Sequence, residues 1–184
     1  YVPLLTGQRL SKTVERKHGL LTTERNPMNY KTILVHIDPD KRCAARTEVA
    51  MQMAKQQDAH LIALYAQAPF FLPSYLLEAG LEIVEAHQKA AAEERARTKS
   101  RFDNQVKNLA FSHAEWRTAT SFPVESLTQQ ARCADLIIIG QADPSSDSGV
   151  SDDFPERVVL TACRPVLILP YAGSFISVGK NILI

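Results

Sequence analysis

The segment ADLIIIG, Ala134 to Gly140, is the most apolar strand-like run in the chain. A second run, TILVHI from Thr32 to Ile37, is rich in β-branched residues and ends at Asp-Pro-Asp. Continuous apolar runs of this length, bounded by loop residues, are typical of parallel strands that are buried on both faces. Both runs are therefore interpreted as strands of a parallel sheet.

The rest of the chain alternates between strand and helix patterns. Further strands are expected at His60–Ala66, Glu115–Ser121 and Arg164–Pro170. Amphipathic periodicity predicts helices in the connections, namely 43–57, about 76–110, 123–134 and about 153–162. Five alternations with short links predict an α/β fold, a Rossmann-like doubly wound five-stranded parallel sheet with helices on both faces.

Composition limits the class of protein. The 184 residues suffice for one sizeable core, and 45% hydrophobic with 22% charged residues is ordinary for a globular domain. A net charge of +1 gives no electrostatic reason to expect nucleic acid or anionic lipid as a partner. No apolar run approaches the roughly 20 residues that a membrane-spanning helix needs. We expect neither a nucleic-acid nor a membrane partner.

The three cysteines, Cys43, Cys133 and Cys163, are odd in number and far apart in sequence. A disulfide framework or a zinc site requires closer, paired spacing. The spacing indicates buried, reduced thiols in a cytoplasmic protein.

Three segments, YKTILVHIDPD, ADLIIIG and PERVVLTACRPVLILP, resemble in order and spacing the universal stress protein (UspA) family. The resemblance covers residues 30–170 and implies one domain of that family. Residues 1–29 show no periodicity and are expected to be an irregular extension or tag.

The family often carries two fused copies, and residues 171–184 end on GKNILI, which repeats the pattern of YKTILV near the start. They are therefore interpreted as a linker and the first strand of a second, truncated copy. A sixth strand of the same domain is the alternative.

The family's nucleotide-binding members carry a loop with Gly, two residues, Gly, nine residues, then Gly and Ser or Thr. Small residues are needed there because phosphates approach backbone amides at a helix N-terminus. Gly140 matches the first position, but Asp143 stands at the second. Counting onward reaches Asp153 and Phe154, and alignment on the following helix gives Asp152 and Asp153. Carboxylates repel phosphates, so the resemblance implies a degenerate site that is unlikely to bind ATP, and no cofactor is expected.

The adenine end of the family's pocket would match Asp38, after the first strand, and Ala66, at the end of the second. Asp38 has an equally weighted interpretation as a capping residue in the turn Asp38-Pro39-Asp40. The resemblance therefore implies a degenerate nucleotide pocket that consists of Asp38, Ala66, Gly140 and Asp143.

A metal could reverse the electrostatic argument, because Mg²⁺ bridges carboxylates to phosphates. The ligands would be Asp143, Asp147, Asp152 and Asp153. The simpler interpretation is a solvated loop in which Asp152 or Asp153 caps a helix. With a metal, the protein would be an ATP-binding nucleotide-dependent switch or a weak ATPase, and this is the alternative function.

No catalytic motif accompanies the five histidines. His36, inside the first strand, is expected to be a hydrogen-bonded core or edge residue. The favoured function is a non-catalytic binding or scaffold module in the stress response, which rests on the family resemblance alone.

In the family the last strand pairs with its equivalent from another copy. An open apolar edge is unfavourable, so we expect a homodimer or pseudo-dimer through Val166, Leu167, Ile168 and Leu169. The long helix carries an apolar stripe of Leu77, Leu81 and Val84, which is interpreted as cover for one face of the sheet. An apolar small ligand held by this stripe with Phe70, Phe71 and Tyr75 is the alternative.

Overall fold

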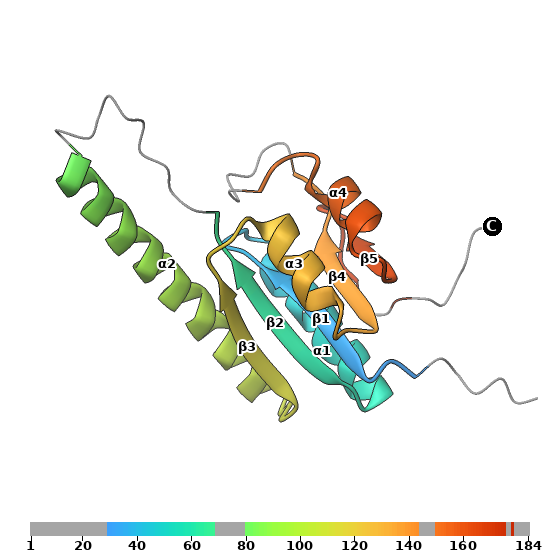
Figure 1. The fold of residues 1–184 in the computed structure, drawn as a ribbon. Coiled ribbons are helices and arrows are strands. Elements are labelled where there is room, and N and C mark those ends of the chain that lie inside the picture. Colours follow the sequence, from blue (N-terminus) through green and yellow to red (C-terminus); the bar gives the residue numbers. More distant parts are fainter. Residues whose placement is uncertain (1–28, 69–79, 144–149, 176–177, 179–184) are drawn as a thin grey trace, which may run out of the picture.

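A computed structural model describes residues 29–68, 80–143, 150–175 and 178. Its centre is one five-stranded sheet in the order β3-β2-β1-β4-β5, and every pairing is parallel. The strands are β1 Thr32–Ile37, β2 His60–Ala66, β3 Ala114–Ala119, β4 Leu136–Gly140 and β5 Val166–Leu169 (Figure 1). The predicted α/β class and the five-stranded parallel sheet are confirmed.

Four helices connect the strands: α1 Cys43–Gln57, α2 Gly80–Asn108, α3 Pro123–Ala131 and α4 Phe154–Thr161. Both α3 and α4 carry a proline in the first turn, where its missing N–H group leaves no bond unmade. The predicted α3 and α4 were slightly too long, and the predicted β3 began one residue late. The start of the long helix, before Gly80, lies outside the described residues.

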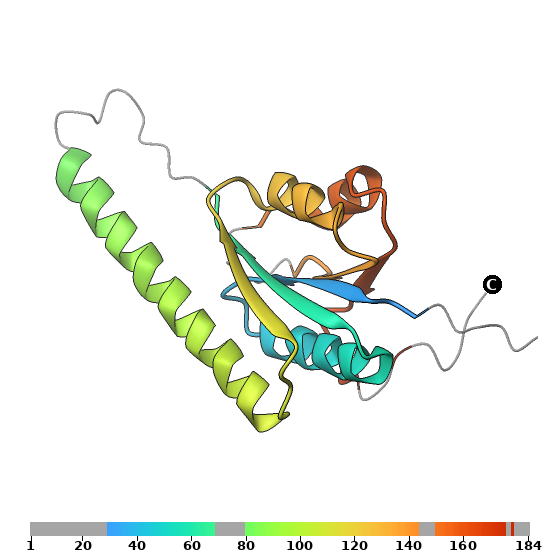
Figure 2. The same cartoon turned by 60° about the horizontal axis from the view of Figure 1, so that its bottom comes forward.

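The helices cover both faces of the sheet (Figure 2). One layer packs Ile33, Val35 and Ile37 of β1 against α1 and against Phe102 of α2. The other layer packs Leu34 of β1 under α3 and α4. Successive side chains of β1 thus enter opposite cores, which explains why its apolar run has no polar alternation.

Strand β5 forms one edge of the sheet. Leu169 is buried in the core, whereas Ile168 is 38% exposed. Val166 and Leu167 are partly buried against the two cores. The predicted interface residues therefore lie on an edge strand, but Leu169 faces the protein's own interior, so its side chain is not available to a partner.

No helix within the described residues has the length and hydropathy needed to cross a bilayer. Residues 1–28 and 179–184 lie outside the described ranges, so the predicted extension 1–29, apart from Asn29, and the predicted strand of a second copy lie outside them. The aromatic segment with Phe70, Phe71 and Tyr75 lies outside them as well.

Candidate functional site

The sheet brings three of the four predicted pocket residues together. Asp38 follows β1, Gly140 ends β4, and both line one cavity with Asp143 at the carboxyl edge of these neighbouring strands. Ligands bind at this edge in open α/β sheets, where the strand order reverses. Ala66 is buried at the end of β2 and is not among the residues that line this cavity.

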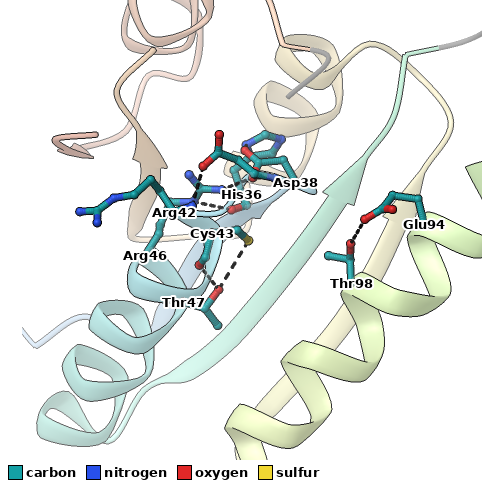
Figure 3. A network of polar contacts seen from close by, with 9 residues as sticks. His36, Asp38, Arg42, Cys43, Arg46, Thr47, Glu94 and Thr98 are labelled. Carbon is teal, nitrogen blue, oxygen red and sulfur yellow. Dashed lines mark hydrogen bonds and ion pairs between the residues drawn. The ribbon is translucent and has the colours of Figure 1, made fainter. Parts of the chain in front are cut away.

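Arg46, which the sequence analysis did not identify as a site residue, lines this cavity together with Asp38 and Gly140. The guanidinium of Arg46, on α1, lies with Nη2 2.8 Å from Oδ1 of Asp38 (Figure 3). The pairing is an ion pair in which Nη2 is not aligned as a hydrogen-bond donor. Nε of Arg46 donates to the backbone carbonyl of His36 at 2.8 Å. The carboxylate that would face adenine in the family's pocket is thus occupied by a cation of the protein itself.

Burial and pairing act in opposite directions on this ion pair. Burial is the largest single effect and would raise the pKa of Asp38, but the lowering effects of Arg46, of His36 and of the Asp40 amide together outweigh it and hold the pKa below its ordinary value. Burial is likewise the largest effect on Arg46 and would lower its pKa, but Asp38, together with Cys43 and Asp40, raises the pKa above its ordinary value. Both groups are therefore charged at neutral pH, and each compensates for the other's loss of water.

The absence of a side chain at Gly140 makes room for the guanidinium of Arg46. A Cβ at position 140 would collide with Nη1 of Arg46, so the guanidinium lies directly against the glycine backbone. The space that remains in the cavity is about 40 Å³. Typical ligand pockets measure about 300–1,000 Å³. Gly140 leaves room for a phosphate in the family's pattern, and in this chain the room is taken by Arg46.

His36 lies beneath the same cavity. It is 1% exposed, and its ring packs 4.8 Å from the ring of Phe154, the first residue of α4. Burial lowers its pKa to about 4; Asp38 opposes this shift and Arg46 adds to it. His36 is therefore neutral at pH 7.

The expectation of a core position for His36 is correct, but the expectation of a hydrogen bond is wrong. Nδ1 lies 3.5 Å from Oδ2 of Asp38, and neither ring nitrogen has a hydrogen-bond partner among the described residues. Asp38 does form the predicted turn as well, since its Oδ1 accepts a hydrogen bond from the backbone amide of Asp40 at 3.2 Å.

Of the acidic positions named in the sequence analysis, Asp143 lines the cavity, and Asp152 and Asp153 precede α4. Asp143 lies 4.0 Å from Nζ of Lys41. Asp152 and Asp153 are exposed just before α4, and Asp153 holds the N-cap position without a side-chain cap bond. The N-cap interpretation is thus correct in position and wrong in its bond. These carboxylates stand at the helix terminus that a phosphate would need.

The residues present do not fit a metal centre. No group of three His, Cys, Asp or Glu side chains within the described ranges could hold an ion. Asp147, the fourth proposed ligand, lies outside those ranges. The magnesium alternative therefore stays an untested prediction with no geometric support from Asp143, Asp152 or Asp153.

The segment after β5 closes the cavity on its remaining side. Nη2 of Arg42, at the start of α1, donates to the carbonyl of Gly173 at 2.5 Å. Tyr171 and Phe175 line the cavity, and Phe175 also packs against the core. Gly173 has a φ of 98°, which a side chain would strain, so glycine allows the turn that the arginine holds.

The thiols behave differently from the prediction. Cys43 is buried at the start of α1, but Cys133 and Cys163 are exposed. Both exposed thiols follow helix ends, where the chain turns into the next strand. Helical proximity alone is therefore a poor guide to burial in this chain.

Comparison with known proteins places these features in context. The model of a family described as the universal stress protein family matches residues 29–170. No curated protein sequence matches the chain significantly.

Several solved structures share the fold. A universal stress protein in complex with cAMP is 22% identical with a TM-score of 0.50, over 77% of this chain and 97% of that one. UspA from Lactobacillus plantarum is 21% identical with a TM-score of 0.59, over 77% and 98%. A universal stress family protein from Burkholderia pseudomallei is 20% identical with a TM-score of 0.50, over 78% and 98%. At identities this low the similarity establishes a shared fold. The ligands of those proteins are not thereby assigned to this chain.

Proposed function

Because the chain belongs to the universal stress protein family, we propose that it acts as a non-catalytic binding or scaffold domain in stress response with a degenerate nucleotide site. The observation that carries the proposal is the ion pair of Arg46 with Asp38 at 2.8 Å. An adenine ring at this carboxylate would have to displace a buried guanidinium. Displacement would leave two charges without their partner, which is strongly unfavourable in a buried site.

Two further features support exclusion of a nucleoside triphosphate. The cavity of about 40 Å³ is smaller than a nucleotide by a wide margin. At the start of α4, Asp152, Asp153 and Glu156 already supply negative charge to the helix N-terminus. A polyphosphate would meet repulsion where the family's glycine loop offers backbone amides.

The competing function is a nucleotide-dependent switch or weak ATPase that uses ATP with Mg²⁺. It is favoured by the cAMP complex of a protein with the same fold. The family resemblance assigns Asp38 and Gly140 to the pocket that such a ligand would use. The two functions differ in whether an adenine nucleotide stabilises the folded protein.

The thermal unfolding midpoint in the presence of 1 mM MgATP or 1 mM cAMP distinguishes them. A ligand at about 100 times its Kd adds about 2.7 kcal/mol to the free energy of unfolding, which raises Tm by roughly 5–10 °C in a chain of this size. We expect a change below about 1 °C with either nucleotide. Magnesium triphosphate without adenosine is the control for charge and metal effects. A shift of several degrees with MgATP, and none with triphosphate, would establish the switch instead.

We also propose a homodimer or pseudo-dimer through the edge of β5. Support comes from the edge position of the strand and from the 38% exposure of Ile168. Light scattering should give twice the chain mass at micromolar concentration. Ile168→Lys should shift the protein toward monomer, while Ile83→Lys on α2, where the native side chain is 44% exposed, should not. A wild-type monomer at tens of micromolar would remove this proposal.

A further inference from the structure

A second cavity lies on the other side of Asp38, between α1 and α2. Its volume is about 380 Å³, roughly ten times that beside Gly140. Asp38 lines both cavities, whereas Arg46 and Gly140 line only the smaller one. Arg46 therefore occupies the smaller cavity. The larger cavity, at the same carboxyl end of β1, does not contain it.

The described residues that line this cavity come from the end of β1, the loop after it, α1 and α2. Another cavity, of about 320 Å³ beside Val84, is lined in part by the first half of α2. The cavity between α1 and α2 has the volume of a ligand pocket. It also borders β1, the strand at which the order of the sheet reverses.

The lining is largely apolar with a few hydroxyl groups. Ile37 and Phe102, both buried, form apolar walls. Thr47 on α1 and Thr98 on α2 are buried and project from the two bordering helices (Figure 3). Oγ1 of Thr47 donates its hydrogen to the carbonyl of Cys43 at 2.8 Å and lies 3.9 Å from Sγ of Cys43, whose thiol can donate to it, so one lone pair is left for a ligand. A ligand's hydroxyl or N–H group could donate to that lone pair.

The charges of the lining balance. The lining contains two carboxylates, Asp38 and Asp40, and two cationic side chains, Lys41 and Arg101. Burial also raises the pKa of Cys43, which keeps it a neutral thiol. The cavity therefore offers no net field to attract a polyanion or a cation.

We propose that this cavity binds an uncharged, mainly apolar small molecule that carries one hydroxyl or N–H donor, which Thr47 accepts. The site shares Asp38 and Asp40 with the cavity beside Gly140 but includes neither Arg46 nor Gly140. The competing account is a groove between two helices that holds only water.

The test uses N-phenyl-1-naphthylamine, a neutral apolar fluorophore with one N–H group. Wild-type protein should enhance its fluorescence in a saturable manner at one site per chain. Thr98→Leu fills the cavity and should weaken the apparent Kd at least about tenfold. Ala91→Leu, two turns earlier on the same face of α2, lines the cavity beside Val84 and should leave the Kd unchanged.

Two further variants guard against misfolding of Thr98→Leu. Thr98→Ser retains the hydroxyl and the space, and should bind as wild type does. Ala44→Phe blocks the mouth from the exposed surface of α1 and should weaken binding like Thr98→Leu. Absence of saturable binding by the wild type overturns the proposal. So does equal binding by wild type, Thr98→Leu and Ala44→Phe, or a loss confined to Ala91→Leu.

Discussion

Two clusters in this domain contain the same three side-chain types, an arginine, a carboxylate and a histidine, in opposite surroundings. At the end of β1, Arg46, Asp38 and His36 have side chains that are at most 9% exposed. At the edge strand β3, Arg117 and Glu115 form an ion pair at 2.7 Å with His60 beside them, and their side chains are at least 35% exposed. The chemistry is shared and the access to water differs.

The difference shows that burial, more than the distance between the paired atoms, decides how strongly the stability of the fold depends on an ion pair. In the surface cluster the hydrogen bonds from Arg117 and then His60 are the largest effects and lower the pKa of Glu115 to about 2, while burial opposes them and ranks below both. In the buried cluster burial is the largest single effect on all three groups. The buried cluster must stay complete to be stable, whereas the surface cluster can lose a member to water.

The largest expected effect comes from breaking the buried pair. Arg46→Met should lower the free energy of unfolding by about 3–5 kcal/mol, because Asp38 would remain buried and charged without a partner. Urea unfolding measures the change. Arg117→Met, the matched change in the surface cluster, should cost less than about 1 kcal/mol. Similar losses in both variants would contradict the distinction.

Removal of the partner sharpens this result. Asp38→Asn combined with Arg46→Met leaves no unpaired charge and should recover part of the loss seen with Arg46→Met alone. Additive losses from the two substitutions would show that the groups contribute separately, and the ion pair would then not be the reason for the stability.

The next largest effect concerns pH. His36 has a pKa of about 4 when folded, against 6.5 as the ordinary value. Between these values the unfolded chain binds a proton that the folded chain does not, so the free energy of unfolding falls as the pH falls from 6.5 to 4. The total loss is about 3 kcal/mol, with a limiting slope of about 1.4 kcal/mol per pH unit.

Urea unfolding at intervals from pH 7 to 4.5 tests this expectation. His36→Phe should remove most of the slope, and His60→Gln should leave it in place. Asp38 does not confuse the measurement: its folded pKa is lowered, so its contribution is lost only below about pH 3.9, its ordinary value. An unchanged slope in His36→Phe would show that His36 is not the buried neutral group described.

The smallest expected effect is the response of the surface cluster to salt. Glu115→Gln should lower the free energy of unfolding by less than about 1 kcal/mol at low ionic strength. In 1 M NaCl, where charges are screened within about 3 Å, the difference between Glu115→Gln and wild type should vanish. The loss caused by Arg46→Met should persist in the same salt, and its disappearance would place Arg46 in contact with solvent.

The fold could be predicted from the sequence because each strand is indicated by a local pattern of apolar residues. Leu136–Gly140 needs no partner in sequence to be recognised as a buried strand. The acidic positions of the degenerate loop were equally readable, since Asp143 and Asp153 occupy them directly.

The contents of the pocket depend on contacts between distant residues. Arg46 stands on the buried stripe of α1 between Cys43 and Val49, and a charged residue on such a stripe was the available signal of a buried ion pair. The pairing of Arg46 with Asp38 depends on the path of the loop from β1 to α1. The role of Gly173 depends on the return of the chain after β5 to Arg42. Neither contact has a local pattern.

The central claim is that Arg46 holds Asp38 and closes the nucleotide site. A crystal structure of the protein grown with 5 mM MgATP tests this most directly. The account predicts the guanidinium of Arg46 on Asp38 and against Gly140, with no phosphate density beside that glycine. Density for an adenine nucleotide beside Gly140, with Arg46 moved away from Asp38, would contradict it.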